Sequence, residues 1–123
     1  MQKIDDPILL VKWHETANWL LDRVDGFPKN QRFIFGTRLA DRTLRILELL
    51  VEAAYSPRPR KAALLEQVNR EMAVLRWLVR MAKERKLLSV RQYGYACERL
   101  TECGRMAGGW LKSLGDVECS RDP

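Results

Sequence analysis

A hydrophobic repeat of three and four residues runs along almost the whole chain, and this spacing is typical of amphipathic helices. Turn residues interrupt the repeat at 25–28 and 56–59, where proline cannot continue a helix, and again at 88–89. Ser89 and Gln92 have the spacing of a capping box, which marks a new helix start. The pattern therefore predicts four helices, at about residues 7–25, 29–55, 60–87 and 89–114.

Four amphipathic helices joined by short loops predict an all-α fold, an up-down antiparallel four-helix bundle. The 123 residues suffice for one domain, which we place at residues 1–115, with a flexible polar tail at 116–123 after Gly115. A pair of helical hairpins that completes its core only in an oligomer is the alternative. No apolar run could span a membrane, and the first residues are polar, so we expect a cytoplasmic protein without membrane contact.

Each predicted helix carries an apolar stripe that we expect to face the core. On the first and second helices the stripes are Leu10, Trp13, Ala17, Leu20 and Val24, and Phe33, Thr37, Ala40, Leu44, Leu47, Val51 and Ala54. On the third and fourth they are Leu64, Val68, Met72, Leu75, Val79 and Ala82, and Val90, Tyr93, Cys97, Leu100, Gly104, Ala107, Leu111 and Leu114.

Two of the helices carry more apolar side chains than one core stripe needs. The surplus is Phe35, Leu39, Ile46, Leu50 and Ala53 on the second helix and Val74, Trp77 and Met81 on the third. A single wide stripe beneath bulky neighbours would also explain the excess. We favour contacts between subunits, and predict that these residues, apart from Ala53, form the interface of a homo-oligomer.

Positive charge is concentrated in one quarter of the chain. Residues 58–88 hold nine basic and three acidic side chains, a difference equal to the whole net charge of +6. Six basic residues fall on two helix faces: Arg76, Arg80 and Lys83 on the third helix, and Arg38, Arg42 and Arg45 on the second. Rows of guanidinium groups bind phosphates well, because each group can donate two hydrogen bonds to phosphate oxygens, and Trp77 among them could stack on a base. We predict contacts with nucleic acid or an acidic partner; ordinary solvated helix faces are the alternative.

The sequence contains no catalytic or metal-binding pattern. It lacks a phosphate-binding loop of the Walker type, a nucleophile elbow and the Glu-x-x-His pairs of di-iron bundles. His14 stands alone, and Cys97, Cys103 and Cys119 lack metal-ligand spacing, so we interpret them as reduced thiols. We therefore expect no enzyme activity, no metal and no cofactor.

Segments of the third and fourth predicted helices resemble a known family. The sequences SVRQY at 89–93 and GRMAGGWLKS at 104–113, with LRWLVRMA at 75–82 and KLLS at 86–89, are similar to the accessory variability determinants (Avd) of diversity-generating retroelements. These four-helix-bundle proteins are related to proteins encoded by intervening sequences in 23S ribosomal RNA genes. The resemblance covers nearly the whole chain, from about residue 7 to residue 114.

The resemblance implies a homopentameric, ring-like assembly with a basic surface and no catalytic activity. Its implied partners are the retroelement's reverse transcriptase and nucleic acid, namely template-repeat and flanking RNA, with DNA as an alternative. Together they would support mutagenic retrohoming directed at adenines. Arg76 and Arg80 match the family's contact arginines, whereas Lys83, Arg38, Arg42 and Arg45 are added from helix geometry alone. An intervening-sequence bundle that binds RNA or protein, and a ligand-binding bundle or enzyme, are the alternatives.

Overall fold

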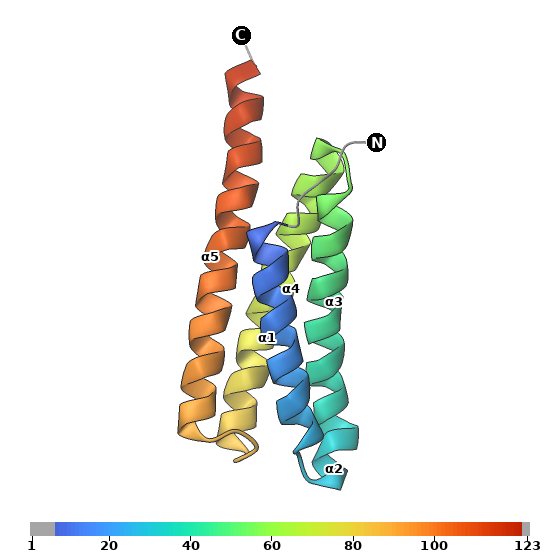
Figure 1. The fold of residues 1–123 in the computed structure, drawn as a ribbon, viewed down its shortest axis with the longest axis vertical. Helices are drawn as coiled ribbons and strands as arrows, with labels where there is room; N and C mark the ends of the chain where they lie inside the picture. The colour runs from blue at the N-terminus through green and yellow to red at the C-terminus, as the bar shows by residue number, and fades with distance from the viewer. Residues whose placement is uncertain (1–6, 122–123) are drawn as a thin grey trace.

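The computed structural model describes the backbone of residues 7–121 and the side chains of residues 7–115. Its helices are α1 (Ile8–Asp25), a short α2 (Lys29–Gln31), the π-helical turn η1 (Arg32–Gly36), α3 (Thr37–Ala54), α4 (Arg58–Glu84) and α5 (Val90–Arg121). The four long helices alternate in direction (Figure 1). They contact one another in the cyclic order α1, α3, α4, α5, so each has two neighbours. The prediction of an all-α protein with four helices packed together is confirmed.

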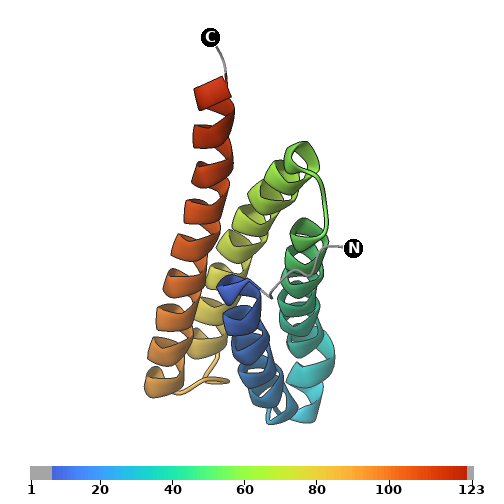
Figure 2. The ribbon, with the colours of Figure 1, turned by 45° about the horizontal axis from the view of Figure 1, so that its top comes forward.

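The C-terminal helix is longer than predicted. We expected a helix end at Gly115, but α5 continues to Arg121 and extends past the other three helices (Figures 1 and 2). A glycine usually ends a helix by adopting a left-handed conformation. No described glycine has a positive φ, so Gly115 continues the right-handed helix. The predicted flexible tail therefore begins as helix, and its last two residues lie outside the described part of the chain.

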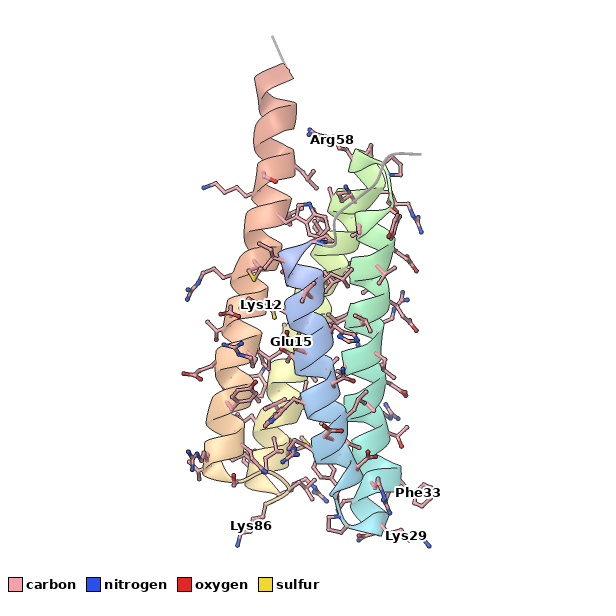
Figure 3. The ribbon with its side chains drawn as sticks, viewed as in Figure 1. Lys12, Glu15, Lys29, Phe33, Arg58 and Lys86 are labelled. Atoms are coloured by element: carbon pink, nitrogen blue, oxygen red, sulfur yellow. The ribbon has the colours of Figure 1, made fainter. Side chains whose placement is uncertain are left out.

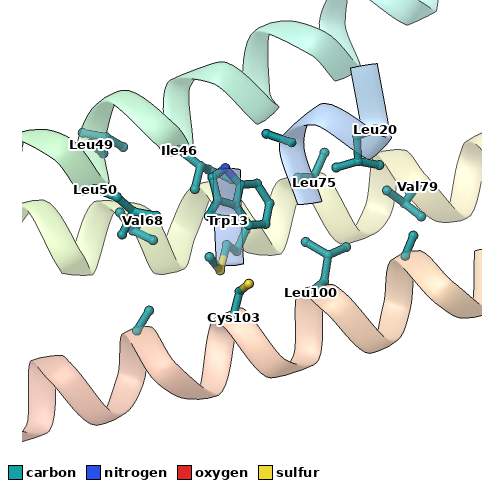
Figure 4. Close-up of a cluster of buried hydrophobic side chains, with 14 of the residues drawn as sticks. Trp13, Leu20, Ile46, Leu49, Leu50, Val68, Leu75, Val79, Leu100 and Cys103 are labelled. Atoms are coloured by element: carbon teal, nitrogen blue, oxygen red, sulfur yellow. The ribbon is translucent and has the colours of Figure 1, made fainter. Parts of the chain in front are cut away.

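The core is centred on Trp13 of α1, which is completely buried (Figure 4). The indole Nε1 donates a hydrogen bond of 3.1 Å to the carbonyl oxygen of Thr43, joining α1 to α3. The predicted stripe of α4 is confirmed, because all six of its members are buried. On α1, Trp13, Ala17, Leu20 and Val24 are buried as predicted. No helix among the described residues is long and apolar enough to cross a membrane.

The orientation predicted for α3 is wrong. Phe35, Leu39, Ile46 and Leu50, which we had assigned to an interface between subunits, are each at most 8% exposed and belong to the core with Ala53. Most of the expected core stripe faces outward instead, with Phe33, Thr37, Leu44 and Val51 exposed and Ala40 and Leu47 half-buried; of this stripe, Ala54 is buried as predicted. Buried side chains cannot contact a second copy, so these four residues leave the predicted interface.

Two local features accompany the orientation of α3. Thr43 lies on the buried stripe, and its hydroxyl donates a hydrogen bond of 2.8 Å to the carbonyl oxygen of Leu39. This bond satisfies the polar group of the threonine inside the core. Before α3, the π turn inserts an extra residue into the helical repeat and rotates what precedes it. Phe33 lies within this turn and projects into solvent near the α2 end of the bundle (Figure 3).

The π turn packs closely against α1. A Cβ on Gly36 would lie 2.9 Å from Cγ1 of Val24, so only glycine permits this approach without a shift. The hydroxyl of Thr37 donates to the carbonyl oxygens of Arg32 and Phe33, at 3.2 and 3.1 Å, one of them five residues back. Carbonyl oxygens of the π turn therefore accept hydrogen bonds from a side chain as well as from the backbone.

The stripe predicted for α5 is rotated slightly from the observed one. Leu100, Ala107 and Leu114 are buried as expected, and Ala96 and Cys103 join them. Val90 is 74% exposed, and Tyr93, Cys97, Gly104 and Leu111 are only half-buried. The half-buried positions lie along the flank of α5 that faces α4, where they help to form the surface described below.

The turn between α4 and α5 has a defined geometry. Lys86 adopts a left-handed conformation with φ of 63°. The amide of Leu87 bonds to the carbonyl oxygen of Ala82, and that of Lys86 to Lys83, which is the Schellman pattern. The predicted capping box follows: Ser89 and Gln92 exchange side-chain to backbone hydrogen bonds of 3.0 Å each. This turn sets the register between the two helices.

Candidate nucleic-acid interface

Three of the six predicted basic residues lie together on the flank of α4 next to α5. Arg76, Arg80 and Lys83 are spaced by four and three residues, so they stand one above another beside the buried stripe, and all three are exposed. We call this flank, together with Trp77 and Tyr93, the α4–α5 surface. Basic side chains also mark both ends of α4, where Figure 3 shows Arg58 and Lys86. Basic side chains therefore stand at both ends of this helix as well as on its flank beside α5.

Arg76 is held in place by α5. Its Nη2 donates to the carbonyl oxygen of Leu100 at 3.1 Å, and its Nη1 approaches the hydroxyl of Thr101 at 3.4 Å. A Cβ on Gly104 would lie 3.2 Å from the same Nη2, so the glycine leaves room for the guanidinium. A guanidinium has five N–H donors. Arg76 can thus hold α4 to α5 and still present donors to solvent.

Arg80 and Lys83 each lie over an aromatic ring. The Arg80 Cζ is 5.4 Å from the centre of the Trp77 ring, and the Lys83 Nζ is 5.1 Å from that of Tyr93. Arg80 also approaches Glu84 at 3.5 Å, but both side chains are more than half exposed. Such a surface ion pair contributes at most about 1 kcal/mol. Arg80 therefore remains available to an incoming anion.

A hollow of about 290 Å³ lies between the two helices. Its lining is Arg76, Trp77 and Arg80 from α4 and Tyr93 and Cys97 from α5. The hydrogen bond between Tyr93 and Cys97 raises the pKa of the Tyr93 hydroxyl above its ordinary value, with smaller contributions from the Cys97 charge and burial. Tyr93 is consequently neutral at pH 7. No described acidic residue lines this hollow, so the two guanidinium groups dominate its charge.

The other predicted row has a different environment. Arg42 Nη1 pairs with Glu71 of α4 at 2.7 Å, and Arg45 Nη1 with Glu48 at 3.5 Å. A second hollow, which we call the α3 hollow, is lined by the three arginines of this row, Arg38, Arg42 and Arg45, together with Leu44 and the acidic residues Asp41, Glu48 and Glu71. Glu71 points from α4 toward α3, whereas Arg76 points toward α5, so the two rows lie on opposite flanks of α4. The structure does not bring the six residues onto one surface, and the α3 row is balanced by acidic neighbours.

The apolar residues predicted to contact other copies divide into two groups. Val74, Trp77 and Met81 of α4 are 38%, 67% and 46% exposed, as an outward face requires. The four predicted on the α3 side are buried, as described above. In their place, α1 and α3 present a separate hollow of about 330 Å³, lined by Leu10, Val11, His14, Leu47 and Val51. His14 thus lies beside aliphatic side chains.

Sequence reasoning did not identify Tyr93 and Cys97 as site residues. Both were placed on the core stripe of the last helix, because their spacing from Leu100 fits a heptad. The structure places them at the edge of the core, facing Arg80. Only the rotation of α5 against α4 reveals this position. Among the described residues, no group of three or more His, Cys, Asp or Glu side chains could hold a metal ion.

Comparison with known families places the chain among the accessory proteins. The model of the bAvd-like family matches residues 8–114, from the start of α1 to well into α5. The chain belongs to the bAvd-like family. Membership implies an accessory role in a diversity-generating retroelement. No curated protein and no solved structure matches the chain. The resemblance based on residues 75–82 and 104–113 is therefore confirmed at the level of the family.

Proposed function

We propose that this bAvd-like chain is a nonenzymatic cytoplasmic protein that binds nucleic acid through the α4–α5 surface and associates with the reverse transcriptase of its retroelement. In this role it would support adenine-directed mutagenic retrohoming. The observation that carries the proposal is the exposed row of Arg76, Arg80 and Lys83 beside two aromatic rings. Template-repeat and flanking RNA is the proposed ligand, with DNA as the alternative. The family match supports this role over that of an intervening-sequence protein.

The α4–α5 surface is a better candidate than the α3 row because of its charge balance. The α3 row faces Asp41, Glu48 and Glu71, so an approaching phosphate meets as many acidic as basic groups. Glu84 is the acidic residue paired with the α4 row. Exposed charges attract an anion through their summed field. The α4–α5 surface should therefore bind a polyanion more strongly than the α3 row does. We therefore assign Arg42 mainly to holding α3 against α4.

Contacts of this kind recognise the nucleic-acid backbone. Side chains on smooth helix faces reach phosphate oxygens without entering a groove, so binding should depend strongly on salt and weakly on sequence. The cytoplasmic location is consistent with Cys97 and Cys103, which are unpaired thiols in the structure. Selection of the template RNA would then come from the reverse transcriptase or from RNA structure.

The test compares two double variants of equal charge. Arg80→Ala with Lys83→Ala removes two proposed phosphate contacts but keeps the bonds of Arg76 to α5. We expect it to weaken binding of template-repeat RNA and to reduce the slope of log affinity against log salt by about 1.4, or about 0.7 per phosphate contact. Fluorescence anisotropy over a range of salt concentrations measures both quantities, and circular dichroism confirms that the helices remain.

The matched control is Arg38→Ala with Arg45→Ala, which changes the net charge equally on the other flank. We expect this control to bind RNA nearly as tightly as the unaltered chain. Equal losses from both double variants would show that only total charge matters and would contradict the assignment. Co-purification of the same variants with the reverse transcriptase tests whether that partner uses the α4–α5 surface.

We also propose that the chain assembles with itself. The exposed apolar residues Val74 and Met81 on α4, and the aliphatic hollow on α1 and α3, supply surfaces for such contacts. The subunit number five comes from the family resemblance. Light scattering on a sizing column tests it, since a pentamer has five times the 14.4 kDa mass of one chain. A monomer at micromolar concentration would exclude the ring.

A further inference from the structure

Trp77 is the most prominent aromatic side chain on the α4–α5 surface. It is 67% exposed, although tryptophan side chains are among the most buried in folded proteins on average. The residue before it, Arg76, is fixed by two hydrogen bonds to α5, and the Arg80 guanidinium lies 5.4 Å from its ring. An exposed aromatic ring among basic side chains is the combination used to bind single-stranded nucleic acids.

The hollow beside Trp77 has the dimensions of a small subsite. Its volume of about 290 Å³ is just below the range of about 300–1,000 Å³ found for pockets that enclose a whole small-molecule ligand. One side is formed by Arg76, Trp77 and Arg80, and the other by Tyr93 and Cys97. A planar group can lie against Trp77, while phosphates on either side of it reach the arginines.

Tyr93 adds a polar group without adding negative charge. Cys97 beside it raises the pKa of the tyrosine hydroxyl, so at pH 7 Tyr93 remains a neutral donor and acceptor. A base edge can accept from or donate to such a group, and Tyr93 itself does not repel the neighbouring phosphates. The α3 hollow differs in both respects, because it has no aromatic lining and contains Asp41, Glu48 and Glu71.

We propose that this hollow binds one unpaired base of an RNA strand, stacked on the ring of Trp77, so that the α4–α5 surface favours single-stranded over double-stranded RNA. The inference rests on the proposed function and adds the form of RNA to it. In a duplex the faces of the bases are covered by their neighbours, so a side chain on a convex helix reaches only phosphates. A single strand offers phosphates and an exposed base together.

The test measures the binding of a short single-stranded RNA of mixed sequence and of its duplex, by fluorescence anisotropy at one fixed salt concentration. Trp77→Leu should weaken binding of the single strand by about 5- to 150-fold, the range for loss of one stacked base, and should leave duplex binding unchanged. Trp77→Phe keeps a ring and should retain most of the single-strand affinity. Phe33→Leu is the matched control, because it removes another exposed aromatic ring, 71% exposed, that lies outside the α4–α5 surface.

Several outcomes would overturn the inference. Trp77→Leu could lower both affinities equally or neither, or the phenylalanine variant could bind no better than the leucine variant. A smaller mass of Trp77→Leu in light scattering would place Trp77 between copies, as the sequence first suggested, and would also overturn it. Failure of the proposed function looks different, because the unaltered chain would then bind neither RNA form. A single-stranded DNA of the same sequence shows whether the 2′-hydroxyl contributes.

Discussion

The orientation of α3 can be tested by truncating two nearby residues, Leu44 and Ile46, and comparing how much each change lowers the free energy of unfolding. The sequence pattern assigns Leu44 to the core and Ile46 to a contact between copies, whereas the structure buries Ile46 completely and leaves Leu44 39% exposed. Truncation of each residue to alanine removes the same number of carbon atoms. The two variants therefore differ in burial and hardly at all in chemistry.

The expected magnitudes follow from these exposures. Ile46→Ala removes about 2.4 kcal/mol of burial free energy, at about 0.8 kcal/mol per carbon, and leaves an enclosed cavity, so the total cost lies at about 2–5 kcal/mol. For Leu44→Ala the burial contribution is smaller in proportion to its exposure, about 1.5 kcal/mol at most, and no closed cavity forms. Against a domain stability of about 5–15 kcal/mol, this difference is large.

Urea unfolding followed by circular dichroism measures both variants, at two protein concentrations tenfold apart. The concentration series separates loss of core packing from loss of contacts between copies, because only the second changes with dilution. We expect the cost of Ile46→Ala to be independent of concentration. If Leu44→Ala costs as much as Ile46→Ala at both concentrations, the orientation of α3 described above is wrong.

Three further predictions concern the turn after α4 and the buried thiol. Lys86→Gly should raise the free energy of unfolding by about 1 kcal/mol, because glycine adopts the left-handed conformation without strain; a lower melting temperature would contradict this. Ser89→Ala should lower it by about 1 kcal/mol in urea titrations, since the amide of Gln92 loses its cap, and an unchanged midpoint would argue against the capping box. Burial raises the pKa of the Cys103 thiol, so the folded chain keeps this proton to a higher pH than the unfolded chain does. Stability should therefore fall as the pH rises above the ordinary thiol pKa of about 8.5, and Cys103→Ala should remove that part of the decrease.

The part of the site that could be predicted from sequence is the part that lies on one helix. Arg76, Arg80 and Lys83 share a flank because helical spacing places them there, and no neighbour is needed to see it. Their combination with Tyr93 and Cys97 could not be predicted, since it depends on how α5 is rotated against α4. The same limit applies to the α3 row, whose partner Glu71 comes from another helix.

The sequence by itself determined the number of helices, most of their ends and the inward face of α4. These properties are local: Pro28 and Pro57 stand directly before new helices, and on α4 one apolar stripe that includes Leu75, Val79 and Ala82 is long and unbroken enough to identify the buried face. Only the tertiary structure decided which of the two apolar stripes of α3 is buried. Both stripes are apolar enough, and the choice depends on distant contacts, namely the bond of Trp13 to Thr43 and the close approach of Gly36 to Val24.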